Sequence, residues 1–195
     1  MKVEKIILAS QSPRRKQLLE WAEISFEIII PHTDESYDFG LSPFEVAEHI
    51  AENKALAVKK KIADKNANGN GYTILSADTI VVLGNKIIGK PAGRDDAINT
   101  LKQLSGKTHS VITGVCLLSK EHKKIFFDET LVEFHRLTQS QVEYYVDNYK
   151  PYDKAGGYAI QEWIGVIGIK SINGDFYNVM GLPVSRVIKE LSALE

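Results

Sequence analysis

The feature that most constrains the fold is a pair of long strand-forming runs in the middle of the chain. Residues 108–119 and 124–134 both carry the apolar and β-branched content of strands, and only a short polar link separates them. Paired strands of this length, mixed with helices, indicate an α/β or α+β fold with a mixed sheet. They argue against a pure repeat of parallel strand–helix–strand units.

Helix-start signals lie between the strand-forming runs. Ser12 followed by Pro13 is an N-cap with a proline in the first turn. Two capping boxes, at residues 42–45 and 138–141, place a Ser or Thr three residues before a Glu or Gln. The expected helices are therefore 12–21, 42 to a loop at 64–71, 95–104 stopped by Ser105-Gly106, and 138 to just before Pro151.

The other expected elements are mostly short. Strands are predicted at 6–9, 25–31 and 73–83, and a Gly84-Asn85 turn leads into a strand at 86–88. A last hairpin is predicted from residues 164–172 and 176–179 around Asn173-Gly174. A terminal helix is expected to start at Pro183, with an inner face of Val184, Val187, Ile188 and Leu191.

Composition excludes several classes of protein. The 24 Lys and Arg residues nearly cancel the 25 Asp and Glu residues, and the net charge of −1 argues against coating of nucleic acid or anionic membranes. Cys116 is the single cysteine, which excludes an internal disulfide and a cysteine-rich zinc site. No signal peptide or membrane span is expected. We therefore predict a soluble, cytoplasmic protein of one domain or two small lobes.

The first candidate for a functional site is the segment from Ser10 to Arg15. A strand ends there and a helix begins with Arg14 and Arg15 in its first turn. Helix N-termini favour anions, and the guanidinium fork matches phosphate geometry. Phosphate binding is one interpretation, and ordinary surface arginines at a solvated helix start are the other.

The second candidate is Asp78, which interrupts an apolar strand. Buried carboxylates are costly unless they are paired, hydrogen-bonded or bound to a metal. A carboxylate at the functional end of a strand suits a general base or a metal ligand. A structural aspartate that caps a nearby turn is the alternative.

Further charges lie in loops and on one helix. Asp34-Glu35 follows a predicted strand, Lys54 lies near the apolar side of the long helix, and Lys90 follows the predicted 86–88 strand. Singly, each is typical of a solvated surface. Together they offer acids for a divalent ion and bases for a polyphosphate, which phosphate transfer requires.

The fourth candidate is the segment 151–161, which contains paired glycines, Lys154 and Gln161. The glycines allow close approach of the backbone to a ligand, Lys154 is long enough to contact a phosphate, and Gln161 has both a donor and an acceptor for a base edge. A turn followed by a strand is the alternative. Common nucleotide-binding loops and histidine spacings typical of zinc sites are missing.

Seven segments, in order along nearly the whole chain, carry a family resemblance: LASQSPRR (8–15), ENKA (52–55), ADTIV (77–81), GKP (89–91), GKTHSVITG (106–114), DKAGGYAIQ (153–161) and DFYNVMGLP (175–183). On these segments the chain resembles the Maf family, the septum-formation-inhibitor-like nucleotide pyrophosphatases. The resemblance implies a hydrolase that converts a nucleoside triphosphate to the monophosphate and pyrophosphate with Mg²⁺ or Mn²⁺. It also implies a single catalytic domain over 1–195, similar to inosine triphosphate pyrophosphatases, with an elongated mixed sheet in two lobes and a cleft between them.

The resemblance also implies roles for particular residues. The catalytic aspartate corresponds to Asp78, and the pyrimidine branch of the family, similar to dTTP/UTP pyrophosphatases, is marked by Arg14, Thr79 and Gln161. The remaining polar site residues correspond to Ser10, Ser12, Arg15, Glu35, Lys54, Lys90 and Lys154. Our hypothesis is that Asp78 and Glu35 hold the metal, Asp78 activates a water, and the basic residues neutralise the leaving pyrophosphate.

Two alternatives remain at this stage. One is the same chemistry on a modified purine such as 7-methyl-GTP, or removal of other non-standard nucleotides. The other is a non-catalytic, nucleotide-binding regulator of septum formation. The expected partner is a free nucleoside triphosphate rather than a nucleic-acid polymer or a membrane, and a homodimer is compatible with the sequence.

Overall fold

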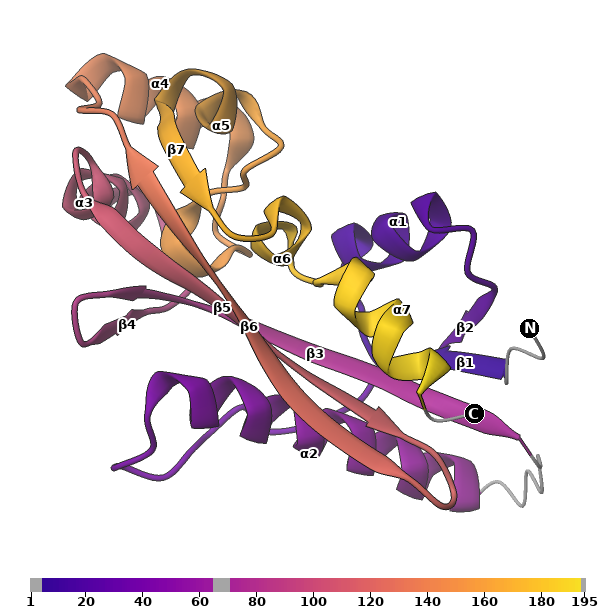
Figure 1. Cartoon of the computed structure of the whole chain (residues 1–195). Helices are drawn as coiled ribbons and strands as arrows, with labels where there is room; N and C mark the ends of the chain where they lie inside the picture. Colours follow the sequence, from indigo (N-terminus) through magenta and orange to yellow (C-terminus); the bar gives the residue numbers. More distant parts are fainter. Residues whose placement is uncertain (1–4, 65–70, 194–195) are drawn as a thin grey trace. The chain divides into compact units, whose positions relative to one another are not determined.

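The computed structural model describes residues 5–64 and 71–193 (Figure 1). The strands are β1 Lys5–Leu8, β2 Phe26–Ile28, β3 Tyr72–Leu83, β4 Lys86–Ile88, β5 Thr108–Leu118, β6 Lys123–Phe134 and β7 Ile169–Asn173. The helices are α1 Pro13–Trp21, α2 Pro43–Asp64, α3 Arg94–Leu104, α4 Gln139–Tyr149, the 3₁₀ turn η1 Ala155–Gly157, α5 Trp163–Gly168, α6 Phe176–Met180 and α7 Val184–Ser192.

The described strands form one mixed sheet in the order β2-β1-β3-β5-β6-β7, with β4 paired to β3 beside this path. The predicted α/β class with a mixed sheet is confirmed. Among the described residues, no helix has the length and apolarity that crossing a membrane requires.

The chain divides into two compact units. Unit 1 comprises Met1–Asp78, Thr113–Asp128 and Gly181–Glu195, and unit 2 comprises Thr79–Ile112 and Glu129–Met180. Strands β3, β5 and β6 each contribute residues to both units. The predicted cleft between two lobes stays a prediction.

Unit 1 contains a parallel strand core. β1 pairs in parallel with β2 on one side and with β3 on the other. Parallel neighbours need a crossover connection, and helices α1 and α2 supply the two crossovers. The carboxyl ends of β1 and β2 and the middle of β3 therefore lie at the same edge.

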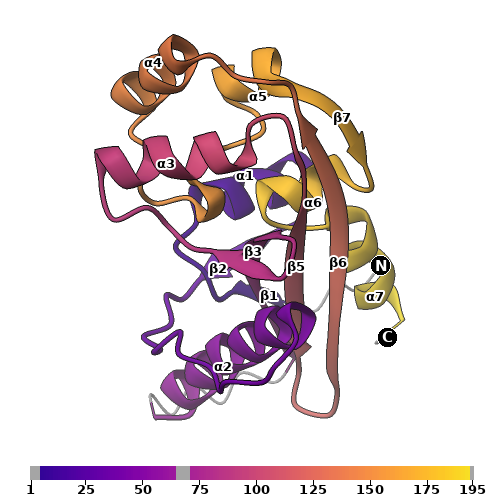
Figure 2. The same cartoon turned by 90° about the vertical axis from the view of Figure 1, so that its left-hand side faces the viewer.

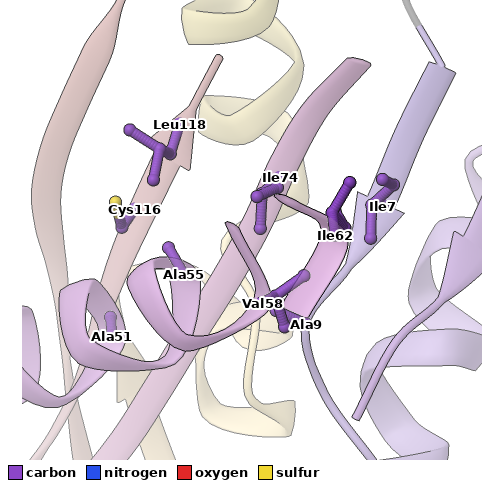
Figure 3. Close-up of a cluster of buried hydrophobic side chains, with 9 residues drawn as sticks. All are labelled: Ile7, Ala9, Ala51, Ala55, Val58, Ile62, Ile74, Cys116 and Leu118. Atoms are coloured by element: carbon purple, nitrogen blue, oxygen red, sulfur yellow. The ribbon is translucent and has the colours of Figure 1, made fainter. Parts of the chain in front are cut away.

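Helix α2 covers this sheet along an apolar stripe. Its Ala51, Ala55, Val58 and Ile62 pack against side chains of β1, β3 and β5 (Figure 3). Small alanines allow the helix to approach closely, and Gly114 on β5 shows how closely: a Cβ there would lie 2.3 Å from the carbonyl carbon and oxygen of Ala47. The position of α2 on the sheet is thus set by backbone contact.

A hydroxyl group also holds α2 in this position. The buried Ser76 hydroxyl on β3 donates a hydrogen bond of 2.6 Å to the Ala51 carbonyl oxygen. The predicted capping box starts the helix as expected, because Glu45 accepts from both the backbone and the hydroxyl of Ser42.

Unit 2 is built around helices and an aromatic cluster. Helices α3 and α4 lie side by side (Figure 2) and are joined by Arg94, which donates two hydrogen bonds to Asp147 at 2.6 and 2.9 Å. The buried His109, Phe134 and Tyr158 rings contact one another, and His109 Nε2 lies 2.7 Å from the Tyr158 hydroxyl. These contacts connect β5 and β6 to the segment that follows η1.

The predicted last hairpin is wrong. Residues 163–168 form α5, because the Glu162 carbonyl accepts from the backbone N–H groups of Gly165 and Val166. Only 169–173 forms a strand, and it pairs with β6. Residues 176–180 form α6, which starts where Asp175 accepts from the Tyr177 N–H at 2.7 Å. Local β propensity is overridden here by tertiary packing.

Three smaller expectations also changed. The strand predicted at 25–31 is shorter, since β2 spans only Phe26–Ile28. Ile188, assigned to the inner face of the terminal helix, is exposed, while Val184 and Val187 are buried as predicted. The loop predicted at 64–71 lies almost wholly outside the described residues. The other predicted elements agree with the structure to within one or two residues.

We predict that Gly114→Ala lowers the free energy of unfolding by about 2 kcal/mol or more, because the methyl group would meet backbone atoms of α2. Urea unfolding followed by circular dichroism measures the change. Gly89→Ala is the matched control, since a Cβ at Gly89 has no neighbour within 4 Å. A Gly114→Ala midpoint equal to that of the wild type would contradict the close contact of α2 with β5.

A second prediction concerns pH. Burial lowers the pKa of His109 to about 4 from 6.5. The unfolded chain therefore protonates His109 at a higher pH than the folded protein does. The free energy of unfolding falls as the pH drops below about 6.5, by about 2 kcal/mol between pH 7 and pH 5. Urea titrations at both pH values should show this loss in the wild type and a smaller one in His109→Asn. The exposed His122 serves as the control position, and an equal loss in His109→Asn would exclude this origin.

Candidate functional site

Buried charge is concentrated at the predicted site. Among the described residues, the buried Asp, Glu, Lys and Arg residues are Arg15, Lys54, Asp78 and Lys154, each at most 9% exposed as a whole residue. Such side chains are almost never fully buried unless they are paired. All four were predicted as site residues from the sequence. The charged groups whose burial costs most free energy are therefore all at predicted site positions.

Three of the predicted residues follow or lie on the parallel strands of unit 1, near the edge formed by the carboxyl ends of β1 and β2. Ser10 follows β1, Glu35 lies in the loop after β2, and Asp78 lies on β3 just beyond its pairing with β1. In open α/β sheets this edge is where ligands bind. The topology alone therefore collects a hydroxyl and two carboxylates from distant parts of the sequence.

Lys54 connects the two carboxylates. Its ammonium Nζ lies 2.7 Å from Asp78 Oδ1 and 2.8 Å from Glu35 Oε1. The lysine lies in the middle of α2 beside Ala55, and the packing of that helix on β3 and β5 sets its position. Glu35 is about half exposed, whereas the other two side chains are nearly enclosed.

Arg15 lies in the same electrostatic neighbourhood. Its Nε donates to the Gly181 carbonyl at 2.8 Å, and its Nη1 donates to the Ser10 hydroxyl at 3.3 Å. Burial lowers the pKa of Arg15, and the negative charges of Asp78 and Glu35 act in the opposite direction. The guanidinium is thus buried within the field of both carboxylates.

Helix α1 starts at the predicted N-cap residue, Ser12, but without the expected capping hydrogen bond. The backbone N–H of Ser12 instead donates to the Ser10 hydroxyl at 3.1 Å. Ser10 therefore accepts from both Ser12 and Arg15, and Arg14 lies half-buried beside them in the first turn.

Unit 2 holds the remaining candidates. Lys154 is buried and lies 2.8 Å from Asp153 Oδ1 and 3.6 Å from Glu162 Oε1. The Gly156 N–H donates to the Gly89 carbonyl at 3.1 Å, which joins the segment of Lys154 to the loop of Lys90. Gly156 needs its positive φ of 70°, and a Cβ there would lie 2.9 Å from Val81.

The predicted residues thus fall into two groups. Unit 1 contains Ser10, Ser12, Arg14, Arg15, Glu35, Lys54 and Asp78, and unit 2 contains Thr79, Lys90, Lys154 and Gln161. Hydrogen bonds or ion pairs directly join Ser10 to Ser12 and Arg15, and Lys54 to Glu35 and Asp78. Lys90 and Gln161 are exposed.

Sequence reasoning missed two residues that hold the candidates. Gly181 positions Arg15 through its carbonyl, and its signal was its place in segment 175–183, which carries the family resemblance. Glu162 contacts Lys154 from the N-cap of α5. Its signal would have been an acidic residue directly after the fourth candidate segment.

The donor set in unit 1 is suited to a hard divalent cation. Mg²⁺ is usually bound by one or two carboxylates, with substrate phosphates and waters completing its shell. Asp78 and Glu35 supply two carboxylates around one ammonium. No group of three or more potential His, Cys, Asp or Glu ligands occurs among the described residues. Asp78 and Glu35 are thus the residues here that could hold such a cation.

The sequence profile described as Maf-like protein matches residues 5–194. The chain belongs to the Maf family. Its segments that carry the site residues are therefore those of a Maf protein, which confirms the resemblance inferred from the seven motifs.

Two named relatives illustrate the similarity. A dTTP/UTP pyrophosphatase of Bacteroides thetaiotaomicron is 46% identical over 97% of this Maf chain and 95% of its own. A dTTP/UTP pyrophosphatase of Parabacteroides distasonis is 47% identical over 98% and 96%. A crystal structure of a Vibrio cholerae protein matches over 96% of this chain and 97% of its own, at 12% identity and a TM-score of 0.40.

Because the Lys54–Asp78 ion pair is buried, it should contribute more to the stability of the protein than an exposed ion pair of the same length. Lys54–Asp78 and Lys123–Glu52 are both 2.7 Å long, but the Lys54 side chain is 11% exposed and that of Lys123 is 52% exposed. We expect Lys54→Met to lower the free energy of unfolding by about 3 kcal/mol, because Asp78 loses its cation in a desolvated place.

Urea unfolding of a double-mutant cycle measures this coupling. Lys54→Met combined with Asp78→Asn should lose less stability than the sum of the two single changes. Lys123→Met is the matched control and should leave the midpoint unchanged, because exposed pairs contribute little. Additive effects in the cycle would show that the Lys54–Asp78 pair is not coupled.

Proposed function

We propose that this Maf protein is a nucleoside triphosphate pyrophosphatase that hydrolyses dTTP and UTP to the monophosphate and pyrophosphate. The observation that carries the proposal is the buried Lys54 ammonium between Asp78 and Glu35 at the carboxyl ends of parallel strands. The names of the two relatives support the choice of substrates.

In this mechanism Asp78 is the general base. It accepts a proton from a water that attacks the α-phosphorus, and the bond from that phosphorus to the bridging oxygen breaks as pyrophosphate leaves. Lys54 offsets the negative charge of Asp78 and Glu35, which would otherwise repel a triphosphate. No covalent intermediate with the chain is required.

A divalent cation, Mg²⁺ or Mn²⁺, would be held by Asp78 and Glu35. When bound, it would supply Lewis-acid polarisation of the phosphates and neutralise part of their charge. We assign Ser10, Ser12, Arg15, Lys90 and Lys154 to the binding of phosphate oxygens. Arg15, Lys54, Lys90 and Lys154 stabilise charge that accumulates on the leaving pyrophosphate, which is electrostatic preorganisation.

We assign recognition of the base to Arg14, Thr79 and Gln161. A uracil or thymine edge presents an acceptor, a donor and an acceptor, and the amide of Gln161 can pair with two of them. Gln161 is exposed, as a side chain that reads a ligand must be before binding. This assignment extends the proposal from phosphate chemistry to the choice of pyrimidine.

The proposal concerns a free nucleotide. A net charge of −1 offers little attraction to a nucleic-acid polymer or to an anionic membrane. A cytoplasmic location and a homodimer stay predictions.

The test measures release of pyrophosphate and of phosphate from a panel of triphosphates with Mg²⁺ or Mn²⁺. We expect pyrophosphate release from dTTP and UTP by the wild type, and a loss of at least about a hundredfold in Asp78→Asn, which removes the base. Asp95→Asn makes the same change at a side chain that is 93% exposed, and it should retain full activity.

Three outcomes would contradict the proposal. Equal rates for the wild type and Asp78→Asn would remove Asp78 from its role. Preference for a modified purine such as 7-methyl-GTP would change the substrate. No hydrolysis of any triphosphate with either metal would favour a non-catalytic, nucleotide-binding regulator.

A further inference from the structure

The proposed mechanism gives no role to the buried hydroxyl of Tyr145 in unit 2. Tyr145 on α4 is fully buried, and its hydroxyl contacts two points of the segment that carries Gln161. It accepts a hydrogen bond of 3.1 Å from the Ala159 N–H, and it donates one to Glu162 Oε2. These two contacts lie on either side of Gln161 in the sequence.

The direction of both hydrogen bonds is set by chemistry. A backbone N–H can only donate and an ionised carboxylate can only accept, so the hydroxyl must accept from Ala159 and donate to Glu162. The hydroxyl therefore has one arrangement that satisfies both partners. A segment held at two points so close together has little freedom between them.

Glu162 extends this connection to the predicted phosphate site. Its other carboxylate oxygen, Oε1, lies 3.6 Å from Lys154 Nζ. Glu162 is the N-cap residue of α5, a position that favours Ser, Thr, Asp or Asn, and its side chain makes no capping hydrogen bond. The carboxylate instead connects Tyr145 and Lys154.

We propose that Tyr145 is a positioning residue for substrate selectivity, because its single hydroxyl fixes the Ala159–Glu162 segment and, through Glu162, the ammonium of Lys154. This inference rests on the proposed function, in which Gln161 reads the pyrimidine and Lys154 binds phosphate. Tyr145 itself touches neither base nor phosphate in this scheme.

Tyr145 and Glu162 connect the residue proposed to read the base, Gln161, with the residue proposed to bind phosphate, Lys154. Gln161 is exposed, so the position of its side chain depends strongly on the backbone on either side. Lys154 is buried, with Asp153 and Glu162 as its carboxylate contacts at 2.8 and 3.6 Å. Loss of the Tyr145 hydroxyl should therefore weaken base recognition by Gln161 directly. It should affect the position of Lys154 only through Glu162.

The test is Tyr145→Phe, which removes the hydroxyl and keeps the ring. Steady-state kinetics with dTTP, UTP and CTP would be measured well below the melting temperature of each variant. We expect kcat/KM for dTTP relative to CTP to fall about tenfold, mainly through a higher KM for dTTP, because a hydrogen bond to a charged group and a fixed backbone are lost.

Tyr149→Phe is the matched control. Tyr149 lies on the same helix and stacks on Tyr145, with ring centroids 5.0 Å apart. Tyr149→Phe therefore removes a hydroxyl from a neighbouring ring and leaves the hydrogen bonds of Tyr145 in place. Its selectivity should equal that of the wild type. Glu162→Gln keeps an acceptor for Tyr145 but removes the charge beside Lys154, so it should lower kcat by about threefold or more and preserve selectivity.

The outcomes separate the inference from the proposed function. If the wild type is active and Tyr145→Phe loses the same fraction of activity on every triphosphate, or none, the hydroxyl is merely structural and the inference is overturned. If the wild type releases no pyrophosphate from dTTP or UTP, the proposed function fails and the inference falls with it.

Discussion

A buried ammonium group needs negative charge around it, and Lys54 has two carboxylate oxygens within 2.8 Å. The rest of the candidate site in unit 1 depends on this arrangement. Without the lysine, Asp78 would be a desolvated carboxylate and would repel a polyphosphate. With it, both acidic groups are held beside a positive charge. Arg15, buried and within the field of both carboxylates, adds a second positive charge.

The position of Lys54 follows from packing that is remote from any chemistry. Alanines on α2 let the helix lie close to the sheet, Ser76 holds the Ala51 carbonyl, and Gly114 leaves room for the backbone of Ala47. These contacts set the depth of the helix and so the distance between the ammonium and β3. In unit 2 a comparable role falls to the buried Tyr145, whose hydroxyl contacts Ala159 and Glu162 on either side of Gln161. Both units thus use packed, buried groups to hold exposed or charged ones.

Local signals in the sequence were reliable where the structure is decided locally. The capping box of Ser42 and Glu45 starts α2, and that of Thr138 and Gln141 starts α4, because the side chains satisfy backbone N–H groups a few residues away. The last hairpin failed for the opposite reason. Residues 163–168 are rich in β-branched and aromatic side chains but form a helical turn, and Asn178 fixes the following helix by donating to the Val111 carbonyl and the Thr130 hydroxyl. Those partners are 67 and 48 residues away, and no local pattern contains them.

The sequence by itself determined the α/β class, the Maf family and the identity of the charged candidates, because these depend on residue types, their order and their local spacing. Only the tertiary structure decided that Lys54 bridges Asp78 and Glu35, that Arg15 holds the Gly181 carbonyl, and that Tyr145 connects Ala159 to Glu162. These contacts join residues from different elements, many of them far apart in the chain. Their partners are chosen by burial and by the need to satisfy every buried polar group, which acts only once the chain has folded.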